Sequence, residues 1–136
     1  MQEQNTIMTA GQQAAAFRAL SALLDEVYGA GADRPYLVGP DPHSFRDAGS
    51  AIGKTLVYLS DFVKAMGDVP LRAVTHHEYI EIDYLNVLNA SFLDTSAELG
   101  DAIVKAVRGA SASVEVWAGE VRGGPRAPRA APRLPS

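Results

Sequence analysis

The chain has 136 residues, enough for one small domain, and its 47% hydrophobic and 21% charged residues exclude an intrinsically disordered protein. It has no cysteine, which excludes disulfides and thiolate chemistry, and no apolar run of roughly 18 residues that could span a membrane. The net charge of −4 is unevenly distributed. Residues 1–120 carry 8 basic and 16 acidic side chains, whereas residues 121–136 carry four arginines and no acid. The acidic character of residues 1–120 argues against a nucleic-acid-binding surface.

The first predicted helix begins at Thr9, which forms a capping-box pattern with Gln12 three residues later. Apolar residues follow at helical spacing, and Gly29 ends the pattern; they are Phe17, Leu20, Leu24 and Val27. The next apolar run, 35–39, is too short for a helix and is followed by Pro40. It predicts a buried strand with a loop after it.

A second helix is predicted from Ser50 to Met66, with an apolar stripe at helical spacing and Gly67 as its end. Leu71 to Thr75 then predicts another short strand that runs into the polar segment 76–79. The stretch from Ile80 to Ser91 has no clear period, and we interpret it as a loop with one turn of helix.

The last two elements follow the same order of helix and strand. Thr95 and Glu98 form a second capping-box pattern, which predicts a third helix that ends at Arg108-Gly109. Apolar and polar residues then alternate from Ser113 to Gly119, as in a strand. We expect residues 1–120 to form the folded unit and the Arg/Pro-rich residues 121–136 to be a disordered tail.

Alternation of helices and strands predicts an α/β fold with parallel strands joined by right-handed crossovers. Three such strands would be an incomplete domain, because parallel sheets are usually covered on both faces and open edges are liabilities. The pattern therefore predicts a section of a larger α/β fold.

Polar residues stand at the predicted strand ends: Asp41, then His76, His77 and Tyr79, then Glu120. In a (β/α) barrel, functional residues occupy the carboxyl ends of the strands. Neighbouring residues of a strand point to opposite faces, so we expect one histidine toward the helices and the other away from them. For the same reason the two histidines are poor joint metal ligands, and no metal site is predicted.

Three segments resemble heparanase-like glycoside hydrolases in order and spacing: Leu37-Val38-Gly39-Pro40-Asp41, Val74-Thr75-His76-His77-Glu78-Tyr79 and Val116-Trp117-Ala118-Gly119-Glu120. The resemblance implies a partial (β/α)₈ TIM barrel, from about strand four or five to strand seven. It further implies retaining hydrolysis of β-glucuronide linkages by two glutamates, with no cofactor. The substrate would be a glucuronide-containing glycan or proteoglycan, and the parent protein would be extracellular, lysosomal or membrane-associated.

The resemblance also assigns roles to individual residues. Glu120 would be the nucleophile, and Glu3 the acid/base, because their separation of 117 positions agrees with the spacing in that family. His77, Tyr79 and Asp41 would bind the substrate. Gln2 stands where the family has an asparagine that contacts the sugar.

The chain departs from the family because it lacks the first strands of the barrel and the part of the family's chain that follows the strand of the nucleophile. We therefore expect little or no glycosidase activity from this chain alone, since three strands cannot close a barrel. The Arg/Pro-rich end is interpreted as a frame change or mis-predicted exon. Two alternatives stay open: a non-catalytic small α/β carbohydrate-binding or interaction module, and a metal-dependent hydrolase that uses the histidines.

Overall fold

The computed structural model describes residues 8–29, 31–45, 49–82 and 90–125. Helices and strands alternate along the chain, as the sequence predicts. The elements are α1 (Ala10–Tyr28), β1 (Leu37–Phe45), α2 (Gly49–Met66), β2 (Leu71–Ile82), α3 (Ala90–Ala110) and β3 (Glu115–Pro125). The α/β fold class is thereby confirmed.

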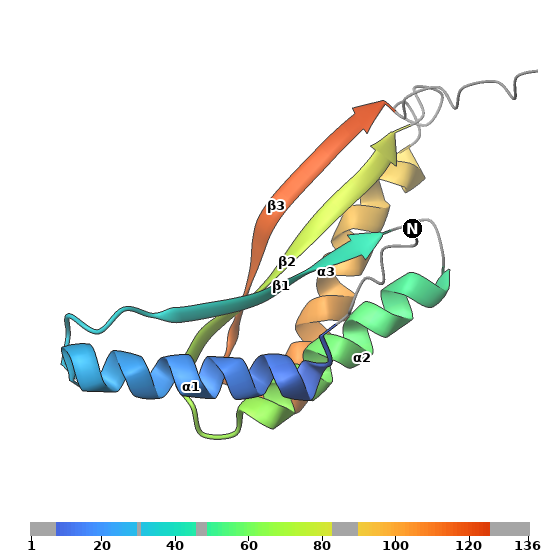
Figure 1. The fold of residues 1–136 in the computed structure, drawn as a ribbon. Coiled ribbons are helices and arrows are strands. Elements are labelled where there is room, and N and C mark those ends of the chain that lie inside the picture. The colour runs from blue at the N-terminus through green and yellow to red at the C-terminus, as the bar shows by residue number, and fades with distance from the viewer. Residues whose placement is uncertain (1–7, 30, 46–48, 83–89, 126–136) are drawn as a thin grey trace, which may run out of the picture.

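The three strands form one parallel sheet in the order β1-β2-β3. Because crossovers between parallel neighbours share one hand, α2 and α3 lie on the same face of the sheet. Helix α2 packs between α1 and α3, so all three helices gather on that face (Figure 1). Within the described residues the sheet is open, and no helix or strand covers its other face, here called the open face. No helix in this described part is long and apolar enough to cross a membrane.

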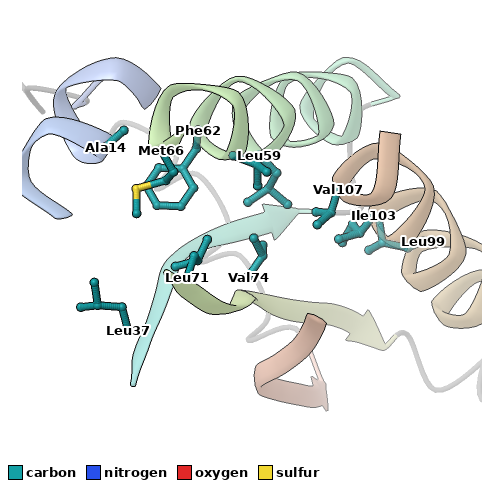
Figure 2. Packing of buried hydrophobic residues seen from close by; sticks show 11 residues of the cluster. Ala14, Leu37, Leu59, Phe62, Met66, Leu71, Val74, Leu99, Ile103 and Val107 are labelled. Carbon is teal, nitrogen blue, oxygen red and sulfur yellow. The ribbon is translucent and has the colours of Figure 1, made fainter. Parts of the chain in front are cut away.

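The hydrophobic core lies between the sheet and the helices (Figure 2). Helix α2 supplies its centre, where the rings of Phe62 and of Phe17 from α1 form a T-shaped pair at a centroid distance of 5.2 Å. Leu37 and Val74 enter this core from β1 and β2, and Ile103 and Val107 enter it from α3. Each helix therefore contributes an apolar stripe to the core. In α1 the predicted stripe is confirmed only in part, because Phe17 and Leu24 pack against the core whereas Leu20 and Val27 are exposed.

The predicted start of the first helix is confirmed in atomic detail. The Thr9 hydroxyl accepts a hydrogen bond from the backbone N–H of Gln12 at 3.2 Å, and the Gln12 side chain accepts one from the backbone N–H of Thr9 at 2.9 Å. Gly29 and Gly67, which follow α1 and α2, have φ values of 68° and 61°. This left-handed conformation favours glycine and ends both helices.

The strands extend further than the sequence predicts. β1 continues through Pro40 to Phe45, which an edge strand tolerates because the missing N–H need not face a neighbour. β2 and β3 stay paired as far as Ile82 and Pro125. Residues 121–125, which were predicted to begin a disordered tail, belong to β3, and the rest of the predicted tail lies outside the described residues.

The start of the third helix also differs from the prediction. Helix α3 begins at Ala90, so Thr95 lies inside the helix and does not cap it. Part of the stretch interpreted as a loop is strand at one end and helix at the other. A hydroxyl three residues before a glutamate occurs within helices too, and the pattern alone does not locate the first turn.

Two residues of α2 provide a test of this packing. Leu59 is fully buried, while Val57, two positions earlier in the same helix, is exposed. We expect Leu59→Ala to lower the free energy of unfolding by about 2–5 kcal/mol, because it leaves a cavity in the core. Val57→Ala should change it by less than about 0.5 kcal/mol. Urea unfolding followed by circular dichroism measures both, and equal effects would contradict the assigned core face.

Candidate functional site

The open face of the sheet carries side chains in rows across the three strands. Pairing in the parallel ladder brings equivalent residues of neighbouring strands to one face. Two successive rows on this face are Val38, Ala73 and Glu115, then Pro40, Thr75 and Trp117. Trp117 is exposed, and its indole N–H donates to the Glu115 carboxylate at 2.9 Å. The predicted alternation in β3 is confirmed, since Val114 and Val116 pack against the core instead.

Beyond these rows the ladder is irregular on both sides of β2. The register shifts between Pro40 and His43 in β1, and Asp41 within this shift has a φ of 61°. Between β2 and β3, His76 pairs with Ala118 but His77 pairs with Glu120, so Gly119 is an extra residue in β3. Bulges of this kind re-aim side chains, and they are frequent beside functional sites.

These irregularities bring two acidic side chains to His77. The Asp41 Oδ2 atom lies 2.5 Å from His77 Nε2, and the Glu120 Oε2 atom lies 3.9 Å from His77 Nδ1. The side chains of His77, Asp41 and Glu120 are 20%, 41% and 50% exposed, so the ring is the most enclosed member. We call these three residues the Asp41–His77–Glu120 cluster.

The distances define what each contact is. An ionised carboxylate only accepts hydrogen bonds, so the Nε2–H group of His77 donates to Asp41. The 3.9 Å separation of Nδ1 from Glu120 is too long for a hydrogen bond but close enough for an ion pair when the ring is protonated. The cluster therefore presents one carboxylate, Glu120, that is not directly bonded to the histidine and is half exposed.

His76 occupies the opposite, helix-covered face of β2 and is buried. Its backbone position agrees with the prediction that adjacent histidines face opposite ways. Its Nδ1 atom has no hydrogen-bond partner, although the ring bonds to the Trp117 backbone. Burial lowers the pKa of His76 from its usual value near 6.5, and the negative charges of Glu78 and Asp41 oppose this only in part.

The remaining predicted site residues lie elsewhere. Tyr79 is two positions beyond His77 in β2, where its backbone pairs with Phe45 and Arg122. Gln2 and Glu3 fall outside the described residues. No group of three histidines and acids in the part that the structure describes is placed to hold a metal ion.

Sequence reasoning placed Asp41, His77 and Glu120 at one end of the sheet but missed how they meet. The Asp41 carboxylate lies where a side chain at position 119 would begin, so a Cβ atom on Gly119 would overlap it. Gly119 is thus part of the site, although it carries no functional group. A glycine directly before a strand-end acid was the available signal in the sequence.

A separate cavity of about 470 Å³ opens at the other end of the sheet, where β1 and β2 begin. Its charged groups are already paired. Arg34 binds Asp25 and the Ser21 hydroxyl, and Arg72 binds Glu115 at 2.7 Å. This cavity lacks a free functional group of the kind that the cluster offers in Glu120, and the cluster is the better candidate site.

Comparison of the chain with known proteins identifies no relative. No protein-family model matches the chain, and no curated protein matches it. The likeness to heparanase-like glycoside hydrolases therefore stays a prediction that depends on the three sequence segments.

The burial of His76 predicts how stability depends on pH. Its folded-state pKa is lowered, so above the usual value near 6.5 the ring is neutral in both states and stability is unaffected. As the pH falls below that value, the unfolded chain takes up a proton that the folded chain resists, and stability decreases by at most about 1.4 kcal/mol per pH unit.

Urea unfolding at pH 7.5 and 5.5 measures this loss. His76→Gln retains a donor for the Trp117 backbone but has no ring to protonate, so its stability should differ less between the two pH values. An unchanged difference in His76→Gln would contradict the assignment.

Proposed function

We propose that this chain is part of the catalytic barrel of a retaining, heparanase-like glycoside hydrolase that cleaves β-glucuronide linkages. The observation that carries the proposal is the place of Glu120. It stands half exposed beside His77 and Asp41 on one face of a parallel sheet. The three sequence motifs that resemble the family supply these three residues, and their meeting at one site did not follow from the motifs alone.

The form of the sheet supports the barrel. Helices gather on one face, and the rows of the open face would become the inner layers if further strands closed the sheet. Exposed Val38 and Trp117 would then be covered by the strands that complete the barrel. A closed barrel also removes the open edges of β1 and β3.

The proposed chemistry assigns the two carboxyl groups different tasks. Glu120, ionised, attacks the anomeric carbon and forms a glycosyl-enzyme intermediate while the glycosidic bond breaks. Glu3, protonated, donates to the leaving oxygen and then removes a proton from the water that hydrolyses the intermediate. Retention of configuration requires the two carboxyl groups to lie about 5–5.5 Å apart. His77 and Tyr79 are proposed to contact the sugar.

The test uses the complete native polypeptide that contains this chain, with an aryl β-glucuronide as substrate. Glu120→Gln should lower kcat by about a thousandfold or more, because it removes the nucleophile. Glu120→Ala should regain turnover when azide is added and should release a glucuronosyl azide of inverted configuration. Glu115→Gln, five residues earlier in β3, is the matched control and should retain kcat.

Two outcomes would contradict this proposal. One is a native polypeptide without activity toward β-glucuronides, and the other is activity that survives Glu120→Gln. We also expect the 136-residue chain alone to show little or no turnover, because the barrel is incomplete. Rapid hydrolysis by this chain would show that the site does not need a closed barrel.

A non-catalytic carbohydrate-binding module is the second candidate, favoured by one observation. The Trp117 ring is exposed on the open face next to the cluster, where an aromatic side chain can stack on a sugar. Binding of a glucuronide oligosaccharide to the full chain, measured by calorimetry, would support this function if Trp117→Ala abolishes it and the native polypeptide has no turnover. Retained binding in Trp117→Ala would argue against it.

A further inference from the structure

Asp41 is placed to act on Glu120 without touching it. Its carboxylate contacts the far nitrogen of the His77 ring, and the near nitrogen faces Glu120. The ring of His77 lies between the two carboxylates and links them. We propose that Asp41 is a positioning residue that holds the His77 ring and thereby sets how Glu120 is presented.

Two features of the chain are needed for this contact. Asp41 has a φ of 61°, a left-handed conformation that few residues other than glycine adopt and that aspartate tolerates. Gly119 leaves open the space over β3 that the Asp41 carboxylate fills. An acid that merely faced solvent from an edge strand would require neither, and both together bring its carboxylate to His77.

The hydrogen bond to Asp41 also fixes which nitrogen carries the proton. With Nε2–H donated to Asp41, Nδ1 of the neutral ring is an acceptor that faces Glu120. The orientation of the ring toward Glu120 therefore depends on its contact with Asp41.

The purpose of this arrangement rests on the proposed function, since a nucleophile must be held in line with the anomeric carbon. The arrangement itself does not depend on that function. It differs from the role that the sequence resemblance implies for Asp41, which is direct contact with the substrate. The two roles differ in what an Asp41 variant would change.

The first test is a double-mutant cycle on the full chain, read by the carboxyl ¹³C resonance of Glu120. Asp41→Asn should shift this resonance in the unchanged chain but not in the His77→Gln background, because the effect passes through the ring. Asp68→Asn, the same substitution in the turn before β2, is the control and should leave the resonance in place. An equal shift in both backgrounds, or no shift, would overturn the proposal.

Gly119→Ala provides a second variant that keeps the charge of Asp41. The added Cβ displaces the carboxylate, so the Nε2 proton resonance of His77 should lose its hydrogen-bonded downfield position, as in Asp41→Asn. A downfield position retained in both variants would overturn the proposal.

The second test is kinetic and uses the complete native polypeptide, so it does not depend on the folding of the shorter chain. Asp41→Asn should lower kcat by about tenfold and leave KM nearly unchanged, since a positioning residue does not bind the substrate. A rise in KM at constant kcat would show direct substrate contact and refute positioning. Coupling of Asp41 to Glu120 in the resonance test without any turnover would instead refute the proposed function and leave the positioning role standing.

Discussion

The one-handed crossovers between parallel strands are the constraint on which the rest of the structure depends. Because the strands follow one another in the order β1-β2-β3, every connecting helix lies on the same face. Apolar side chains of α2 and α3 then bury one face of the sheet, and the other face carries the candidate site. The division between core and candidate site is a result of the topology.

β2 shows this division most clearly, because it is the central strand and is paired on both sides. Val74 packs into the core, while Thr75 and His77 belong to the open face. His76 is therefore buried, which lowers its pKa, and His77 next to it meets two carboxylates. The two histidines therefore differ in their surroundings because they lie on opposite faces of the same strand.

Structural features that depend only on residues close together in the chain could be predicted from the sequence. The capping box at Thr9, the extent of α2 and the alternation in β3 each depend on residues a few positions apart. Strand ends could not be predicted, because β2 and β3 continue only as far as their backbones pair with each other. The contact of Asp41 with His77 was missed for the same reason: it requires the register of two strands and the absence of a side chain at Gly119. The part of the predicted site at Gln2 and Glu3 is not tested by this geometry.

The extra residue in β3 has a consequence for how this sequence can change over time. Gly119 is the residue that the ladder skips, because Ala118 pairs with His76 and Glu120 with His77. Loss of that single codon would make the ladder regular and would leave Glu120 opposite His77, on the open face. A substitution at position 119 would instead keep the length of the strand but place a Cβ atom on the Asp41 carboxylate. Lineages are therefore expected to keep a glycine at this position or to lose the residue altogether, and not to carry a larger side chain there.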